Sequence, residues 1–374
     1  MNKEKFIKIM KNIVAVIVVA AMFIIIFYQN RDRDVFKFGK EESSKHIEAS
    51  ETANGNFTGG DIGKVGDKVA LLTTMSYTLL DENAQSESTK IVLSDPLLHA
   101  EENYSVCYNT DSFEITVFKQ ASKAYSVTVE NKIISAKVNK NGYLLAVTEK
   151  EGYNCECRVY NRTGEAVFKW DISKSEFLDG DINCKNNAIA LSLTSSTGNK
   201  LVGEVVIVST ANAEVIEKQS YDSEIFYSVN FNSNDTFTAL GNKRLVYFNS
   251  DGTEKWSYNY GDKELLKADV SNHNNMILAF TDSKKIVNTH STDVKIINRL
   301  GEVSAEKNYD QTVSDISVNE DSVAIALGKE IHITNEKLKD KRVLKTDYIA
   351  DKIVLYDDSR HLFVLGDSGG EILE

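Results

Sequence analysis

The feature that most constrains this chain is a strand-and-turn unit that recurs along most of its length. A β-branched strand runs into an Asn- or Asp-containing turn, which in the clearest copies continues with Gly and Glu. These copies are VYNRTGE at Val159–Glu165, YFNSDGTE at Tyr247–Glu254 and IINRLGE at Ile296–Glu302. Such a repeat is one supersecondary unit that cannot bury its apolar face alone, so neighbouring copies must stack on one another.

The period of the repeat predicts the architecture. When strong and weak copies are aligned on the residue after the strand, the anchors are Asp81, Lys119, Asn161, Ser209, Asn249, Asn298 and Asn335. Successive anchors lie 37 to 49 residues apart, with a mean of about 42. That spacing is typical of the four-stranded blade of a β-propeller.

A second element recurs in step with the first. An alternating strand runs into an Asn- or Asp-rich tight turn and then into a more continuous apolar strand, as in Ser135–Glu149, Ala268–Asp282 and Ser314–Gly328. This order fits a blade, because outer strands alternate whereas a strand packed between neighbouring blades is buried on both faces. No convincing helical period appears in this part of the chain. The sequence therefore predicts an all-β fold.

We count eight repeats, and seven remain possible if the first and last partial repeats form one blade. The repeats begin near Phe57, Pro96, Lys132, Phe177, Phe226, Leu266, Val313 and Asp351. The last repeat lacks an outermost strand, and in a closed propeller a strand from the other end of the chain fills that place and removes an exposed edge. The segment around His46–Ser50 is the candidate for this strand.

The N-terminal region predicts a membrane anchor. Residues 13–28 read IVAVIVVAAMFIIIFY and carry no charge. Sixteen helical residues span roughly 24 Å, and flanking basic side chains make up the shortfall from the ~30 Å hydrocarbon core. A cleaved signal peptide is the alternative, but small residues are missing where its cleavage site would lie. We expect a basic tail at 1–12, a transmembrane signal-anchor helix at 13–28, a polar linker at 29–56 and the propeller at 57–374.

Charge is divided unevenly along the chain. The formal net charge is −12, yet residues 1–40 carry +5 and the remainder carries −17. The four lysines before the apolar run favour a cytoplasmic N-terminus by the positive-inside rule, which would place the propeller outside the cytoplasm on the cell membrane. A domain this acidic repels phosphate backbones, so nucleic acid is not expected as a partner.

The spacing, the order of segments and two turn motifs resemble a known family. FNSDGTEKWSY at Phe248–Tyr258 resembles the turn-Gly-x-x-x-Trp element of quinoprotein-like (PQQ-like) propeller repeats, and YNRTGEAVFKW at Tyr160–Trp170 is similar, with a longer gap before Trp170. The whole chain resembles a family of membrane-anchored PQQ-like or WD-like propellers of unknown function from clostridia and related Gram-positive bacteria. The resemblance implies an architecture and a location but no activity.

No catalytic, cofactor-binding or metal-ligating residue is predicted. Quinone-dependent enzymes of the resembled class hold their cofactor beside a tryptophan and often near a vicinal disulfide, whereas Trp170 and Trp256 are expected on blade strands and no adjacent cysteine pair exists. The six histidines stand singly in the sequence, at His46, His99, His273, His290, His332 and His361. The four cysteines are expected to be unpaired, at Cys107, Cys155, Cys157 and Cys184.

Three short motifs resemble calcium-binding or catalytic sites, and we interpret all three as structural turns. Asn249–Gly252 and Asp179–Asp181 could offer oxygen ligands to Ca²⁺, but we interpret both as turns stabilised by Asx residues. GDSGG at Gly366–Gly370 matches a nucleophile motif, yet no histidine follows it, and we interpret it as the turn of the last repeat.

The function expected from the sequence is that of a membrane-tethered, extracytoplasmic scaffold that binds a protein partner or assists envelope assembly, without enzymatic activity or a cofactor. The alternative is a module that binds a small molecule or cation, since the acidic charge favours cationic ligands. A quinone-dependent oxidoreductase is the third and least supported possibility.

Overall fold

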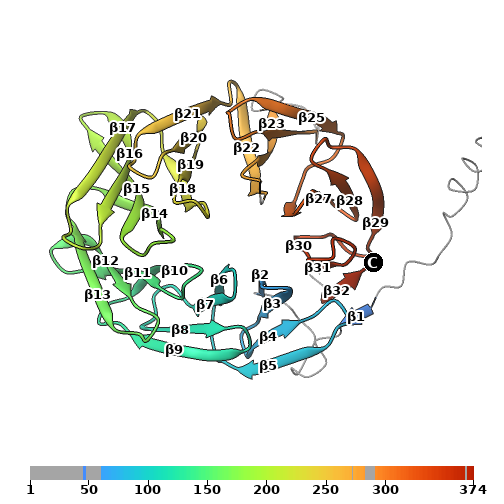
Figure 1. Cartoon of the computed structure of the whole chain (residues 1–374), viewed down its shortest axis with the longest axis horizontal. Helices are drawn as coiled ribbons and strands as arrows, with labels where there is room; N and C mark the ends of the chain where they lie inside the picture. The colour runs from blue at the N-terminus through green and yellow to red at the C-terminus, as the bar shows by residue number, and fades with distance from the viewer. Residues whose placement is uncertain (1–44, 48–59, 272, 283–290, 367–368) are drawn as a thin grey trace, which may run out of the picture. The chain divides into compact units, whose positions relative to one another are not determined.

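Eight four-stranded antiparallel sheets, arranged as blades around a ring, make up the fold (Figure 1). The computed structural model describes residues 45–47, 60–271, 273–282, 291–366 and 369–374. All of these belong to one compact unit, Ser44–Glu374. The predicted all-β propeller is therefore confirmed, with eight blades rather than seven.

Each blade is a meander of four strands ordered from the centre of the ring outwards. The innermost strands are β2 (Asp61–Val65), β6 (Leu97–Glu101), β10 (Ile133–Val138), β14 (Glu176–Ile182), β18 (Phe226–Phe231), β22 (Lys263–Val270), β26 (Asp315–Asn319) and β30 (Lys352–Leu355). The second strands are β3 (Lys68–Leu72), β7 (Tyr104–Tyr108), β11 (Leu144–Lys150), β15 (Ala188–Thr197), β19 (Phe237–Gly241), β23 (Met276–Asp282), β27 (Ser322–Leu327) and β31 (Leu362–Gly366).

The third and outermost strands complete the blades. The third strands are β4 (Ser76–Leu80), β8 (Glu114–Lys119), β12 (Tyr153–Tyr160), β16 (Lys200–Ser209), β20 (Arg244–Phe248), β24 (Thr292–Ile297), β28 (Glu330–Asn335) and β32 (Gly369–Leu373). The outermost strands are β5 (Ser86–Lys90), β9 (Ser122–Thr128), β13 (Ala166–Ile172), β17 (Val215–Asp222), β21 (Glu254–Asn259), β25 (Val303–Tyr309), β29 (Asp340–Lys345) and β1 (Lys45–Ile47). We number the blades 1 to 8 from β2–β5 to β30–β32 with β1.

The ring is closed by the first described strand. β1 pairs antiparallel with β32, with His46 opposite Glu371, and so supplies the outermost strand that blade 8 lacks (Figure 1). This confirms the prediction of a closing strand around His46–Ser50. The observed blades also begin within about four residues of the predicted starts.

Burial follows the position of each strand in its blade. The second strands are buried on both faces, as in β27, where all six residues are buried. The outermost strands alternate, as in β17, whose side chains are in turn exposed and half-buried. Apolar side chains of adjacent blades form the core clusters between the blades, which is the pattern that the sequence predicts for stacked repeats.

The recurring Asn-x-x-Gly motif, followed by Glu directly or after one residue, forms the turn between the third and outermost strands. Gly164, Gly252 and Gly301 have φ of 81°, 87° and 84°, a backbone conformation that favours glycine. At Gly301 a Cβ atom would also lie 2.9 Å from the Trp256 ring. In the same turn the Asn298 amide donates to the Glu302 carboxylate at 3.2 Å, and this side-chain hydrogen bond connects the two ends of the turn.

The N-terminal predictions fall mainly outside the described residues. The described part of the chain contains no helix that is long and apolar enough to cross a membrane, and residues 1–12 and 13–28 lie outside it. Of the predicted linker, 29–56, only β1 is described.

Candidate functional site

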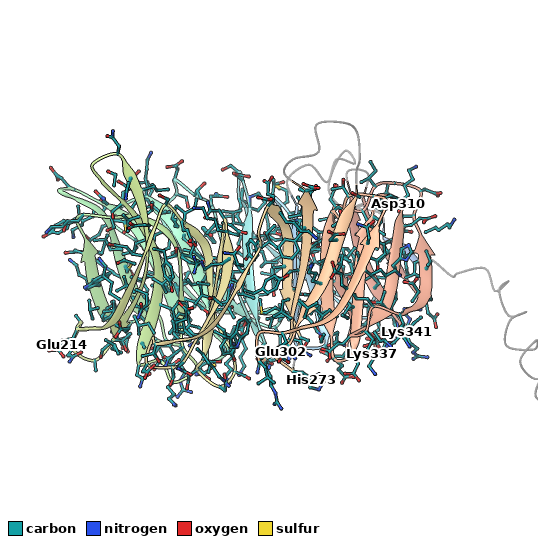
Figure 2. All side chains as sticks on the ribbon, turned by 90° about the horizontal axis from the view of Figure 1, so that it is seen from above. Glu214, His273, Glu302, Asp310, Lys337 and Lys341 are labelled. Carbon is teal, nitrogen blue, oxygen red and sulfur yellow. The ribbon has the colours of Figure 1, made fainter. Side chains whose placement is uncertain are left out.

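The ring presents two faces of different construction. On one, which we call the turn face, innermost strands turn into second strands and third strands into outermost ones. On the other, the loop face, second strands connect to third strands and each blade connects to the next. Figure 2 shows the two faces, with Glu214, His273, Glu302 and Lys337 on the turn face and Asp310 on the loop face.

Around the centre of the ring, side chains of one innermost strand accept hydrogen bonds from the backbone of the next blade. We call them cross-blade acceptors. One set lies two residues before the turn to the second strand. Its acceptor-to-donor pairs are Asp181 with Phe231 N at 2.7 Å, Asp269 with Val318 N at 2.8 Å, Ser317 with Leu355 N at 3.0 Å and His99 with Val138 N at 3.3 Å.

A second set lies two residues earlier along the innermost strands. Its pairs are Asp61 with Leu98 N at 3.0 Å, Asp179 with Val229 N at 2.9 Å and Asp315 with Ile353 N at 2.9 Å. A buried N–H that lost its acceptor would cost about 1–3 kcal/mol, so these side chains hold adjacent blades in register. The structure thus corrects the interpretation of Asp179–Asp181 as a turn: both carboxyls lie on strand β14 and bind blade 5.

Burial of these acceptors changes their protonation. It raises the pKa of Asp181 to about 6 and of Asp269 to about 7, because desolvation disfavours the charged carboxylate. It also raises the pKa of Asp315. Burial, with Lys137 nearby, lowers the pKa of His99 to about 3, so its imidazole stays neutral and can accept the Val138 N–H.

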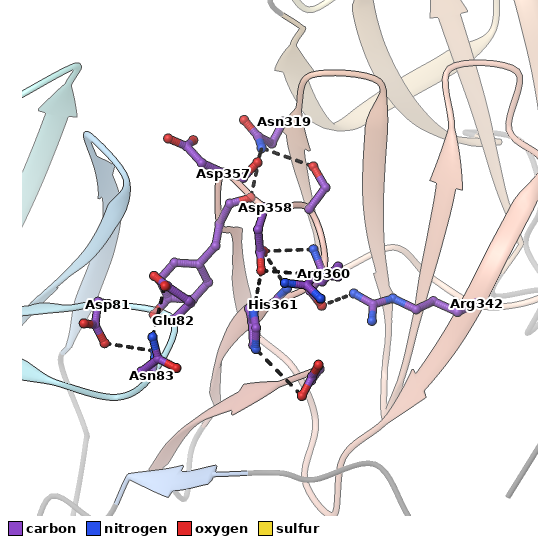
Figure 3. Close-up of polar contacts among 12 residues, drawn as sticks. Asp81, Glu82, Asn83, Asn319, Arg342, Asp357, Asp358, Arg360 and His361 are labelled. Carbon is purple, nitrogen blue, oxygen red and sulfur yellow. Dashed lines mark hydrogen bonds and ion pairs between the residues drawn. The ribbon is translucent and has the colours of Figure 1, made fainter. Parts of the chain in front are cut away.

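A denser set of contacts joins blades 7, 8 and 1, and we call it the closure region. Lys64 of blade 1 donates to Asn319 Oδ1 of blade 7 and forms an ion pair with Asp357 of blade 8, each at 2.7 Å. Asn319 Nδ2 in turn donates to the backbone oxygens of Tyr356 and Asp357 (Figure 3). A further ion pair, between Lys352 and Asp61, joins blade 8 to blade 1.

The junction between blades 5 and 6 differs from the closure region. Among the described residues, no hydrogen bond joins β18 to β22. Ser228 and Asn230 occupy the two acceptor positions on β18, but Asn230 Nδ2 donates to Ser228 Oγ at 2.7 Å within the strand. Asn230 Oδ1 faces Lys137 of blade 3 at 3.4 Å.

A cleft of about 570 Å³ lies at this junction, on the turn face. Buried Leu240 and Met276 contribute apolar surface, and Asn230, Asn232 and Asp269 contribute polar groups. The blade 5–6 cleft is lined by Glu101, Glu102, Asn230, Phe231, Asn232, Ser233, Thr238, Leu240, Ala268, Asp269, Val270, Ser271, Asn274 and Met276.

Two acidic side chains of blade 2 reach the centre of the turn face. Glu101 and Glu102 line both the blade 5–6 cleft and a second cleft of about 560 Å³, to which Lys64, Asn319 and Asp357 also contribute. Water reaches the Glu101 carboxyl, yet protein atoms crowd it. This desolvation is the main cause that raises the pKa of Glu101 to about 7, and the nearby carboxyls of Asp181 and Glu102 raise it further. The arrangement can bind a cation or a hydrogen-bonding polar group.

The loop face carries most of the large exposed apolar side chains. Of the thirteen among the described residues, seven lie on it: Met75, Val92, Phe113, Tyr153, Leu201, Tyr227 and Ile349. Val92 and Phe113 also line a groove of about 620 Å³ between blades 1 and 2, together with Ile91 and Leu93. The other six lie in turns of the turn face or at the turn-face ends of outermost strands: Val167, Val215, Ile216, Val270, Leu300 and Val303. The exposed apolar side chains that border this groove mark it as a candidate interaction surface.

The single histidines occupy different surroundings. His332 lies 3.3 Å from Asp340, and His361 pairs with Asp358 (Figure 3). His46 is known here by its backbone alone, and His290 lies outside the described residues. His273 comes together with Asp321 and Glu336, a grouping that sequence reasoning missed because its members lie on two blades.

The remaining predicted motifs have structural roles. Asn249–Gly252 forms the turn between β20 and β21, where Asp251 accepts from the Thr253 N–H and hydroxyl, as predicted. Gly366 and Gly369 end and begin the paired strands β31 and β32, while Asp367 and Ser368 lie outside the described residues.

The cysteines and tryptophans also lie where the repeat pattern placed them. The four cysteines are free; Cys107, Cys155 and Cys157 are buried and Cys184 is half-buried. Trp170 and Trp256 lie on the outermost strands β13 and β21, so both occupy blade strands as predicted.

The fold defines the class: this is an eight-bladed β-propeller, and its fold is similar to those of a WD40 domain and of BamB. The chain belongs to DUF5711, a family of unknown function whose pattern it matches over residues 8–373. No curated protein is similar enough in sequence to count as a relative.

Solved structures show the same architecture at low sequence identity. The chain is similar to Sqt1 of Saccharomyces cerevisiae, with a TM-score of 0.62, 11% identity and coverage of 89% of this chain and 99% of that one. The C-terminal WD40 domain of Sif2 has the same TM-score and identity, with coverage of 90% and 99%. BamB from Moraxella catarrhalis has a TM-score of 0.54 at 11% identity, with coverage of 89% and 96%. At these identities the likeness concerns the fold alone.

Proposed function

We propose that this chain is a membrane-tethered, extracytoplasmic propeller that serves as a non-enzymatic scaffold for a protein partner. The N-terminus would lie in the cytoplasm, residues 13–28 would cross the membrane, and the ring would present one face to the partner. The sequence supports the tether through its uncharged apolar run and the four lysines before it. The likeness of this fold to a WD40 domain and to BamB is consistent with a role in protein interaction.

The observation that carries the proposal is the exposed apolar groove between blades 1 and 2 on the loop face. Val92 is 68% exposed and Phe113 47% exposed, and both border the groove between blades 1 and 2 on the loop face. Leaving such side chains in water is unfavourable by about 25 cal/mol per Å² of apolar area, so covering them with a partner would stabilise a complex. The cross-blade acceptors and the closure region hold the ring rigid, so this surface is preorganised for binding.

Site-specific photo-cross-linking in intact cells tests this role. A photoreactive amino acid placed at Phe113 should give a discrete cross-linked partner. The same group placed at Leu300, which is 65% exposed on the turn face, serves as the matched control and should not. A Val92→Asp substitution should remove the product formed at Phe113. Equal cross-linking from both positions, or none from the loop face, would refute the proposed surface.

The location is tested separately with fusions to the C-terminus. Alkaline phosphatase folds actively outside the cytoplasm, whereas a fluorescent protein of the ordinary cytoplasmic kind reports the opposite side. We expect phosphatase activity and no fluorescence, with the full-length chain recovered in the membrane fraction. The reverse pattern, or recovery in the soluble fraction, would contradict the tether and its orientation.

The tryptophan positions support a role other than quinone-dependent oxidation. In the enzymes that the repeats resemble, the cofactor is held by inward-facing residues beside a tryptophan. Here both tryptophans lie on outermost strands, away from the centre of the ring. A measurable quinone-dependent oxidation by the purified full-length chain would overturn this part of the proposal.

The blade 5–6 cleft favours a second function, the binding of a small cationic ligand. Asp269 and Glu101 would pair with an ammonium group, and Leu240 and Met276 would contact its aliphatic part. Titration calorimetry of the full-length chain in detergent with spermidine tests this function. Binding that Glu101→Gln weakens would support it, whereas no saturable binding would exclude this ligand class.

A further inference from the structure

Three side chains from two blades converge on the turn face without belonging to either cleft. His273 lies in the turn between β22 and β23, Asp321 in the turn between β26 and β27, and Glu336 in the turn between β28 and β29. His273 Nδ1 is 3.7 Å from Asp321 Oδ1 and 3.7 Å from Glu336 Oε1. The three ligand atoms lie within 4.8 Å of one another.

These separations are too long for hydrogen bonds, which need about 2.7–3.2 Å between nitrogen and oxygen. They approach the spacing of atoms that share a metal ion. Zinc lies about 2.0–2.2 Å from nitrogen and carboxylate ligands, which places two tetrahedral ligands roughly 3.4 Å apart. For the two distances from His273 Nδ1, a shift of a few tenths of an ångström in the side chains would reach that spacing.

Of the three side chains, Glu336 is the one best oriented to bind a ligand. Asn275 of blade 6 donates from Nδ2 to Glu336 Oε2 at 3.0 Å and so fixes the carboxylate across the blade junction. The other oxygen, Oε1, is enclosed by protein and accepts no hydrogen bond. An enclosed, unpaired carboxylate oxygen is unfavourable unless a donor or a cation meets it.

The geometry points to a divalent transition-metal site formed by His273, Asp321 and Glu336. The ligand set, one imidazole nitrogen and two carboxylate oxygens, suits Zn²⁺ better than Ca²⁺ or Mg²⁺, which prefer oxygen ligands. His273 and Asp321 are exposed, so water can fill the remaining coordination position. Asn275 is a positioning residue, since it acts on the metal through Glu336.

The site would join blade 6 to blade 7. His273 comes from blade 6, while Asp321 and Glu336 come from blade 7. The same turn of blade 6 carries Ser271 and Asn274 to the blade 5–6 cleft. A bound metal would therefore fix a turn on one side of that cleft, and it would stabilise the folded ring, because the unfolded chain does not hold the three ligands together.

Titration of the full-length chain in detergent with Zn²⁺, followed by calorimetry, tests the site. We expect saturable binding of one ion, and with Co²⁺ an absorption spectrum typical of a low-coordinate nitrogen and oxygen site. His273→Ala should abolish this binding. Asn275→Ala should weaken it by about 10–100-fold, as removal of an orienting contact does elsewhere.

His332→Ala is the matched control, because His332 also faces a carboxylate, Asp340, but has no third ligand in the grouping. This variant should bind Zn²⁺ as the wild type does. Each variant's circular dichroism should match that of the wild type, so that lost binding is not confused with unfolding. No saturable binding by the folded wild type, or unchanged binding by His273→Ala, would overturn the proposal. Partner capture at Phe113 is measured on the other face and does not decide this result.

Discussion

The closure region and the blade 5–6 junction occupy equivalent places in the ring but are built differently. Asn319 in blade 7 and Asn232 in blade 5 occupy equivalent positions, at the turn between the innermost and second strands of their blades, and both are almost fully buried. Asn319 donates to the backbone of the next blade, whereas Asn232 donates to Thr236 Oγ1 in its own blade. The repeat thus places an asparagine at both junctions. Whether that asparagine bonds to the next blade depends on which backbone acceptors the next blade brings within reach.

The largest effect is expected from removing the two asparagines one at a time. Asn319→Ala removes the hydrogen bonds from Asn319 Nδ2 to the oxygens of Tyr356 and Asp357 and the one that Lys64 donates to Asn319 Oδ1, so we expect a loss of about 2–3 kcal/mol in the free energy of unfolding. Asn232→Ala removes a bond within one blade and should cost about 1 kcal/mol. Urea unfolding followed by tryptophan fluorescence measures both. Equal losses would mean that the two junctions do not differ in strength.

The next effect concerns pH at the rim of the cleft. Because burial raises the pKa of Asp269 to about 7, the folded chain holds this proton at a higher pH than the unfolded chain does. Its contribution to stability is therefore present at acid pH and is lost as the pH rises through about 7. We expect the free energy of unfolding of the wild type to fall by about 1–2 kcal/mol more than that of Asp269→Asn between pH 5 and 7.5.

This pH experiment separates titration from lost contacts. Asp269→Asn also weakens the hydrogen bonds from Val270 N and Val318 N, but that cost does not depend on pH. Only the difference in slope between the two unfolding curves is assigned to the carboxyl. Parallel curves would show that Asp269 titrates in the folded chain as it does in the unfolded one.

A smaller effect is expected from adding an acceptor to the junction that lacks one. Ser228 occupies on β18 the position that Asp61, Asp179 and Asp315 occupy on their strands. Ser228→Asp should offer an acceptor to the blade 6 backbone and raise the free energy of unfolding by about 0.5–1 kcal/mol. The substitution should also reduce spermidine binding if it narrows the cleft. A destabilised variant would show that the blade 6 backbone lies beyond reach.

The smallest effect is expected from the exposed ion pair of the closure region. The Lys352 side chain is 44% exposed, and surface pairs of this kind contribute about 0–1 kcal/mol. Lys352→Met should therefore lower the free energy of unfolding by about 0.5 kcal/mol, and 1 M salt should produce most of that loss in the wild type. A loss as large as that of Asn319→Ala would assign the strength of the closure region to charge rather than to hydrogen bonds.

The architecture was predictable because its determinants lie within one repeat. The period of about 42 residues, the buried second strands and the Asn, Gly and Glu of the turns each act locally, as Gly301 and the Asn298–Glu302 pair show. The closing strand was also predictable, since an incomplete last repeat leaves an edge that another strand must cover.

The candidate sites were not predictable in the same way, because their partners lie one blade away. Asp181 looked like a turn residue, and only its contact with Phe231 N shows its role. The recurring Asp in GDIN, ADVS and SDIS, two or four residues before the turn, was the available signal. For His273, Asp321 and Glu336 no such signal exists, because convergence across two blades depends on how far each turn projects.

The short strand β1 sets how the ring would respond to mechanical load. It is the first described element of the chain, and it closes the ring through three residue pairs with β32. Tension applied to the chain before Lys45 would reach this pairing before it reached any other blade. A pull along the strand would load these hydrogen bonds together, whereas a pull across it would break them one after another. The direction of the tether would then determine whether the propeller withstands the force or opens between blades 8 and 1.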